Sequence, residues 1–351
     1  MNKPIFLFIA CIFFGNSLNA QNIPRSYIAY RSSESILIDG RAEESSWQKA
    51  SFSEDFIDIE GVKKPKYQTN VKMLWDDNYL YFYARIQEPH IWATLKQRDT
   101  VIFYNNDFEI FIDPDGDTYN YMEFEMNALN TVWDLFLVKP YREPAPVIDA
   151  WDFKGLKSNV HIEGTLNDPS DTDKNWSVEV AIPWEVMEEA NVFGNGHEHS
   201  FWRINFSRVN WDYQLDEKTY SRRKNENGDY LPEYNWVWSP QGVINMHEPE
   251  HWGYVYFSSK EVGEKDVFEI PRDEKVKWIL YELYRTSRNF QKDSPDKIKS
   301  LEKLIVKPVN IGDFQLTPEF EEHVSGWNIS LESPFSKIKY SINEEGKIIK
   351  L

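Results

Sequence analysis

The sequence contains no long hydrophobic run. Its longest apolar stretch, from Ile5 to Phe14, is about half of the ~20 residues that a transmembrane helix needs. Lys3 precedes this stretch, and a small-residue segment ending at Ala20 follows it, as in a secretory signal. We therefore predict a signal peptide over residues 1–20, cleavage after Ala20, no transmembrane span, and a secreted, periplasmic or cell-envelope location.

Cysteine is nearly missing as well. The only cysteine, Cys11, lies inside the expected signal, so the mature chain has no thiol and no disulfide. Lipidation at Cys11 is a second interpretation, which the apolar residues Ile12 to Phe14 disfavour. Stability must then come from a hydrophobic core, and 351 residues suffice for one large β-domain with a smaller appendage.

Basic residues are outnumbered by acidic ones. The sequence has 39 Lys and Arg against 57 Asp and Glu, a formal net charge of −18. Such a charge repels polyphosphates, so we expect no nucleic-acid partner. The only local basic run, Arg222 to Lys224, is short.

Signatures of common catalytic sites are also absent. The sequence has no P-loop, no dinucleotide glycine pattern, no His-Glu-x-x-His zinc motif and no Ser-His-Asp signature. A glycosidase needs two carboxylates at a set separation. With 57 acidic residues some such pair always exists, so acidic content alone decides nothing about hydrolysis.

Alternating apolar and polar residues dominate the chain from Ile36 to Phe257. The segment Asp107 to Asn127 contains two such runs around an acidic turn, which predicts a β-hairpin. Further strands are expected over 71–75, 80–87, 131–138, 159–166, 176–182 and 202–209, with short helices at 43–49 and 184–190. No long helix separates these strands, which favours an all-β, antiparallel, jelly-roll-like β-sandwich.

The pattern changes after Phe257. Helical spacing of apolar residues predicts helices over 273–289 and 297–306, and alternation predicts strands over 327–331 and 337–351. We therefore expect a sandwich domain over residues 21–257 and a small α+β extension over residues 258–351. The sequence assigns no role to this extension.

Aromatic residues make up 16% of the chain. Most should pack in the core, but the long segments 139–155 and 210–245 are rich in Trp and Tyr. Long loops in compact domains are usually functional or disordered, and Trp-rich loops are seldom disordered. Trp236 and Trp238 are therefore candidate binding-loop residues.

Six motifs occur in a characteristic order: IDGRAEESSWQKA, TNVKMLWDDNYLYFYARIQEP, the 107–127 hairpin, NWSVEVAIPW, FWRINFSR and HWGYVYF. In this order and spacing, residues 36–257 resemble the carbohydrate-binding module family 9-like domain. That family is a β-sandwich found in secreted xylan- and cellulose-degrading proteins. The resemblance implies a glycan partner, a plant or algal polysaccharide or its oligosaccharides, and work beside polysaccharide-degrading enzymes.

The resemblance also implies binding residues. In the family, two aromatic rings sandwich a terminal sugar, and a Glu on the strand matching 108–112 bonds it. Glu109 matches this Glu, and Phe103 or Tyr104 matches the first ring. The second ring falls at Asn245 to His247, which departs from the pattern, so Trp236, Trp238 or Trp252 is expected to substitute.

Glu125 and Arg203 complete the proposed ligand set, which orients hydroxyl groups by hydrogen bonds. A family arginine falls at Glu125, a departure that puts reducing-end recognition in doubt. The alternative for Glu109 and Glu125 is a solvated or salt-bridged sheet face, with Arg203 as a partner.

The acidic turn of the hairpin carries Asp113, Asp115 and Asp117. Oxygen ligands at alternate positions suit Ca²⁺, which family members often bind structurally. The EF-hand pattern is absent, and the alternative is a polar turn without an ion.

Two other function classes remain open. One is a glycoside hydrolase acting on O-glycosyl bonds. The other is a haem-binding redox module, which would need axial ligands such as Met or His. Alternation directs Met122 and Met126 into the core.

Overall fold

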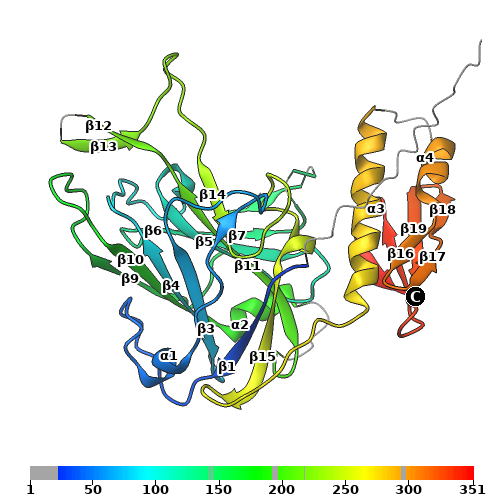
Figure 1. Ribbon diagram of the computed structural model, residues 1–351, viewed down its shortest axis with the longest axis horizontal. Coiled ribbons are helices and arrows are strands. Elements are labelled where there is room, and N and C mark those ends of the chain that lie inside the picture. Colours follow the sequence, from blue (N-terminus) through cyan, green and yellow to red (C-terminus); the bar gives the residue numbers. More distant parts are fainter. Residues whose placement is uncertain (1–22, 141, 144, 192–196, 217, 294–297) are drawn as a thin grey trace, which may run out of the picture.

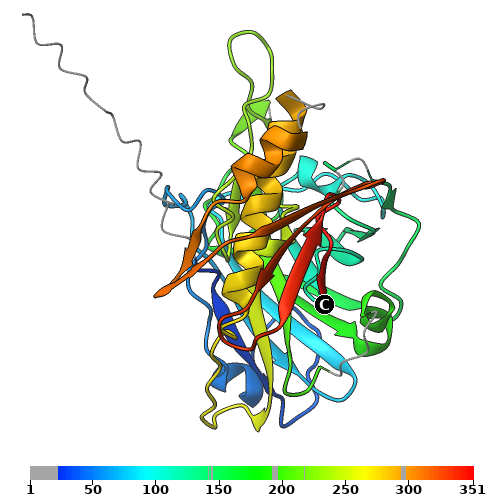
Figure 2. The same ribbon diagram turned by 90° about the vertical axis from the view of Figure 1, so that its right-hand side faces the viewer.

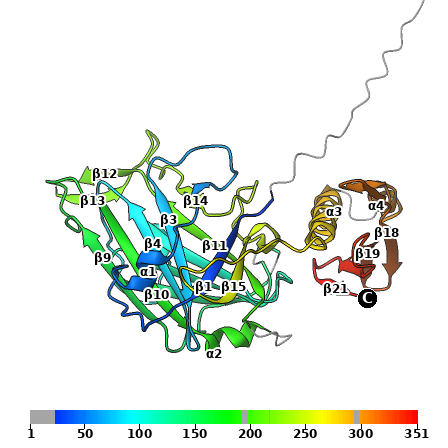
Figure 3. The ribbon, with the colours of Figure 1, turned by 60° about the horizontal axis from the view of Figure 1, so that its bottom comes forward.

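The structure, a computed structural model, describes residues 23–351 except 141, 144, 192–196, 217 and 294–297 (Figure 1). The predicted signal peptide and Cys11 lie outside the described residues. Most of the described chain is a β-sandwich, and a smaller α+β unit lies beside it (Figure 3).

One large sheet, folded over on itself, forms the sandwich. Its first half contains β2 (Ile57–Asp58), β5 (Asp107–Asp113), β6 (Tyr121–Asn127), β7 (Val132–Leu137), β8 (Val147–Ile148), β11 (Phe201–Asn210) and β14 (Tyr234–Val237). Its second half contains β3 (Thr69–Trp75), β4 (Tyr79–Gln87), β9 (Lys157–Glu163) and β10 (Asn175–Pro183). The strands β1 (Ser26–Arg31) and β15 (Gly253–Glu261) join the halves.

The core lies between the two halves of the sheet, because apolar and polar side chains alternate along the strands and the apolar ones point inward. Phe108 and Met122 from one half share a buried cluster with Phe82 and Val178 from the other. Met126 is also fully buried there, so the expectation for both methionines is confirmed. The opposite face of β5 and β6 carries the acidic residues.

The connection through β1 differs from the antiparallel expectation. Tyr27 pairs with Val255 of β15, and Tyr30 pairs with Leu74 of β3, both in parallel. Alternation specifies on which face of the sheet a side chain lies, but it does not specify whether the neighbouring strand runs parallel or antiparallel. The sequence pattern therefore could not predict these two pairings.

Helices in the sandwich are few and short. They are α1 (Ser45–Lys49), α2 (Trp184–Met187) and the 3₁₀ turns η1 (Ile102–Tyr104), η2 (Glu188–Ala190) and η3 (Pro249–His251). The expected helices at 43–49 and 184–190 are thus present. The segment 210–245 is more ordered than a loop, since it contains β14 and a projecting hairpin of β12 (Tyr213–Asp216) and β13 (Thr219–Arg222).

The C-terminal unit has a hydrophobic core of its own. Helices α3 (Glu274–Asp293) and α4 (Ile298–Ile305) accompany β16 (Val309–Ile311), β17 (Phe314–Leu316), β18 (Glu319–His323), β19 (Gly326–Glu332), β20 (Lys339–Asn343) and β21 (Ile348–Lys350). Figure 2 shows α3 beside the four-stranded sheet β18–β21, and Val276 and Leu280 of α3 pack with Trp327 of β19. Among the described helices, none combines the length and the apolar character that a membrane crossing requires.

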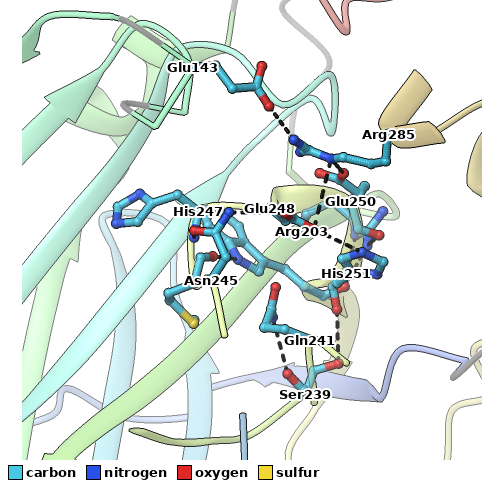
Figure 4. A network of polar contacts seen from close by, with 12 residues as sticks. Glu143, Arg203, Ser239, Gln241, Asn245, His247, Glu248, Glu250, His251 and Arg285 are labelled. Carbon is cyan, nitrogen blue, oxygen red and sulfur yellow. Dashed lines mark hydrogen bonds and ion pairs between the residues drawn. The ribbon is translucent and has the colours of Figure 1, made fainter. Parts of the chain in front are cut away.

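Arg285 of α3 links the two units (Figure 4). Its guanidinium contacts Glu143 and lies 2.7 Å from Glu250 and 3.9 Å from Glu248, three carboxylates that belong to the sandwich. Tyr284, beside it in the chain, donates its hydroxyl to Glu143 as well. The contact between the units therefore includes ion pairs and a hydrogen bond.

Candidate functional site

Carboxylates gather on the outer face of the hairpin β5–β6. Glu109 of β5 lies directly opposite Glu125 of β6, and Glu123 lies opposite Phe111. Glu109 is 6% exposed and Glu125 is 2% exposed. A solvated sheet face would leave these groups in water, so the structure does not support that interpretation. Asp107, at the start of β5, is buried in the same group.

A cavity of about 430 Å³ lies over these carboxylates. Its lining comes from β5, β6 and β7, from single residues of β8, β11 and β14, and from the loops around them. The polar lining residues are Glu109, Glu123, Glu125, Arg142, Asp149, Glu233, Asn235, Asn245 and His247. Carboxylates thus outnumber basic groups, and the cavity favours cations and neutral, hydroxyl-rich molecules over anions.

Aromatic rings line the same cavity. Phe103, from η1, is one of the two rings expected from the sequence, and its backbone N–H donates to Glu125 at 3.1 Å. Tyr104 does not line the cavity. It is 48% exposed, contacts Phe103 edge-to-face and lies under the Arg222 guanidinium. Phe103 therefore belongs to the candidate site, and Tyr104 to its outer edge.

Trp133 was missed by the sequence analysis. It lies on β7 directly opposite Glu125 and lines the cavity. Its indole N–H is buried without a hydrogen-bond partner among the described residues. The strand over 131–138 was predicted, but only the register between β6 and β7 shows that Trp133 shares a face with Glu125.

Burial dominates the electrostatics of the site. It raises the pKa of Glu109 to about 7, and it raises the pKa values of Glu123 and Glu125 well above the usual range, with repulsion from Glu109 adding to both. Burial lowers the pKa of His247 to about 3, so this imidazole is neutral at physiological pH. The positive charge in the cavity lining therefore comes from Arg142 and not from His247.

The position of the expected second ring also lies in this cavity. Asn245, Met246 and His247 all line it, facing the strands that carry Glu109 and Glu125. His247 is held by a 2.8 Å hydrogen bond with the Tyr121 hydroxyl. The sequence order of the motifs therefore brings together the segments that the resemblance implies, although the ring at this position is an imidazole.

Comparison with known families is decisive for the strands that form this site. A family model described as carbohydrate family 9 binding domain-like matches residues 38–198. Over this segment, just under half of the chain, the protein is similar to that family. It contains β5, β6 and β7, whereas Asn245 to His247 lie outside the matched residues. No curated protein matches the chain in sequence.

The solved structures that resemble this chain are distant from it in sequence. A putative carbohydrate-binding protein from Bacteroides uniformis is 16% identical, with a TM-score of 0.48, over 67% of this chain and 100% of its own. A family 9 module from Caldicellulosiruptor kristjanssonii, solved with cellotriose and with glucose, is 15% identical, with a TM-score of 0.42. It covers 70% of this chain and 100% of its own.

Arg203 lies outside the cavity in the family 9-like sandwich. Its guanidinium donates to the backbone carbonyls of Glu250 and Trp252 and lies 3.9 Å from Glu274 of α3. The expectation that it orients a ligand together with Glu109 is therefore not met in this structure. In the pairing of β11 with β5, Arg203 lies opposite Asp113, whereas Glu109 lies opposite Ser207. Arg203 therefore shares a face with Glu109 but lies at the opposite end of β5 from it, which alternation alone does not reveal.

Trp236 and Trp238 are buried in the core. They are 2% and 1% exposed, and both belong to the main hydrophobic cluster. The expectation that they form exposed platforms on a loop is wrong, because the segment is strand β14, which pairs with β11 through Trp236 and Arg208. Trp252 is also fully buried.

The acidic turn forms a second carboxylate group. Oxygens of Asp113, Asp115 and Asp117 lie within 4.8 Å of one another. Backbone N–H groups of Gly116 and Thr118 donate to Asp113, while both Asp115 oxygens are buried without a partner among the described residues. Burial raises the pKa of Asp115 to about 7. These oxygen donors fit a hard cation such as Ca²⁺.

Proposed function

We propose that the protein binds a polysaccharide or oligosaccharide without cleaving it, in the cavity between β5, β6, β7 and the segment 245–247. The observation that carries this proposal is the combination of Trp133 and Phe103 with three buried carboxylates in one cavity. Sugars offer C–H faces that pack on aromatic rings and hydroxyls that donate to carboxylates. The family match over residues 38–198 supports the same ligand class.

Each part of the cavity has a role in this proposal. Trp133 and Phe103 supply apolar contact, and the unpartnered indole N–H of Trp133 donates to a sugar oxygen. Glu109 and Glu125 accept from hydroxyl groups and fix their orientation. This division between an apolar wall and a few convergent polar groups is typical of small-ligand sites.

The wider setting is part of the proposal. The signal-like N-terminus supports secretion to the cell envelope or beyond, and a binding module there would act beside polysaccharide-degrading enzymes in carbohydrate catabolism. Asp113, Asp115 and Asp117 would hold Ca²⁺ in a structural role, where it would neutralise the carboxylates of the turn.

A glycan array on the mature protein, followed by calorimetry, tests the proposed function. Replacing Trp133 by Ala should weaken glycan binding by roughly 1 to 3 kcal/mol, as truncation of binding-site aromatics commonly does. Phe314→Ala, which removes an exposed ring of the C-terminal unit, should leave binding unchanged.

Two results would contradict the proposal. One is equal glycan affinity in the Trp133→Ala variant and the wild-type protein. The other is release of reducing sugars that the double variant Glu109→Gln, Glu125→Gln abolishes, since a binding module saturates whereas a hydrolase turns over.

A further inference from the structure

In the part of the chain that the structure describes, the acidic group beside the cavity has no basic ion-pair partner. We propose that Asp107, Glu109 and Glu125 form a divalent-cation site, with Ca²⁺ as the ion that suits them best. Oxygens from the three residues lie within 4.8 Å of one another. Two oxygens that bind one Ca²⁺ at about 2.4 Å can be separated by up to about 4.8 Å. The spacing therefore matches a shared ion.

The other acidic groups of the described chain provide an internal comparison. Four groups have three carboxylate or imidazole ligand atoms this close together. Three of them have a basic side chain within ion-pair distance, which is Arg285, Arg98 or Lys347. Among the described residues, no Lys, Arg or His forms an ion pair with Asp107, Glu109 or Glu125. Of the four groups found among the described residues, this is the one without a protein cation.

Asp107 provides the second observation. Its side chain is fully buried, and the backbone N–H of Val209 donates to Oδ1 at 3.2 Å. Oδ2 is buried with no hydrogen-bond partner among the described residues. A buried carboxylate oxygen without a hydrogen bond destabilises the folded protein, and Glu109 opposite Glu125 adds repulsion between like charges. A bound cation removes both costs at once.

The donor set indicates the ion. All donors are carboxylate oxygens, which hard cations prefer, and Ca²⁺ accepts six to eight such ligands in flexible geometry. Three carboxylates leave positions open, and Glu109 and Glu125 border the cavity. Water would fill these positions in the free protein. Hydroxyl groups of the glycan would replace that water in the complex, a step that rests on the proposed function.

The ion itself is tested with Ca²⁺ alone on the full chain. An Asp115→Ala background removes the other candidate site, and equilibrium dialysis then counts bound Ca²⁺. We expect one tightly bound ion per chain in this background and at least a tenfold loss of affinity on adding Glu125→Gln. Adding Glu185→Gln, the same change at an exposed position, should have no effect.

The outcomes separate the two proposals. No bound Ca²⁺ in the Asp115→Ala background, or binding that survives Glu125→Gln, overturns the cation site. Circular dichroism and a second variant, Asp107→Asn, guard against misfolding, because a folded Asp107→Asn protein should lose the ion too. Equal glycan affinity in Ca²⁺ and in chelator overturns the step in which glycan hydroxyl groups replace water on the ion. Ca²⁺ binding without any glycan binding overturns the proposed function but still supports the ion site.

Discussion

Replacing Arg285 by Ala should destabilise the protein strongly. Among the described residues, Arg285 is the only ion-pair partner of Glu143 and Glu250, whereas Glu248 also pairs with His251. The Arg285 side chain is 25% exposed, while Glu250 on its sandwich side is 2% exposed. Removing one partner of a buried ion pair costs about 3 to 5 kcal/mol. Since Arg285 retains some contact with water, the lower end applies, and we expect a loss of about 3 kcal/mol in the free energy of unfolding.

Urea unfolding of the full chain, followed by Trp fluorescence and circular dichroism, measures this loss. Arg288→Ala is the matched control: Arg288 also lies on α3 and borders the same interface pocket, but no ion pair involving it is present among the described residues. It should change stability by no more than about 0.5 kcal/mol. Adding Glu250→Gln to Arg285→Ala should recover part of the loss, because the cost resides in the stranded charge. Equal stability of the Arg285→Ala and Arg288→Ala proteins would refute this reasoning.

Three further predictions concern the sandwich. Trp238→Ala should lower the free energy of unfolding by about 3 to 5 kcal/mol, as for other buried aromatics, and a loss below 1 kcal/mol in denaturant titration would show that the ring is not in the core. Adding Ca²⁺ to chelated protein should raise its melting temperature by mass action, and this rise should be smaller in Asp115→Ala; an equal rise in both rejects the turn site. Burial raises the pKa of Glu179 from 4.5 to about 7, so the folded state holds this proton while the unfolded state releases it. Stability should therefore fall as pH increases from about 4.5 to 7, and Glu179→Gln should reduce this fall in unfolding measured at pH 5 and pH 8; an unchanged fall contradicts the assignment.

Most of the sandwich could be predicted because apolar and polar residues alternate along its strands. Alternation in the 107–127 hairpin located the strands and directed Phe108 and Met122 inward, and the structure agrees. Glu109 and Phe103 could be found only through the family resemblance, since nothing in their local pattern distinguishes a binding residue from a sheet residue. Both line the cavity.

The remaining parts depend on long-range pairing that a single sequence does not encode. Trp236 and Trp238 follow a polar segment, and their burial requires β14 to pair with β11. Trp133 meets Glu125 only because of the β6–β7 register. Arg203 donates hydrogen bonds to the carbonyls of Glu250 and Trp252, which belong to a turn that sequence periodicity does not reveal.

The parallel pairing of β1 with β15 has a consequence for the order of folding. Ser26 meets Tyr254, more than two hundred positions later in the chain, whereas hairpins such as β5–β6 close locally. Contacts between distant residues form slowly, because a long loop must be ordered before they contribute. During synthesis β1 emerges first and can pair with β3 early, but its edge towards β15 stays open until β15 has been made. Closure of the sandwich should therefore be its last and slowest step, and a nascent chain halted before residue 253 would carry an open sheet edge prone to intermolecular pairing.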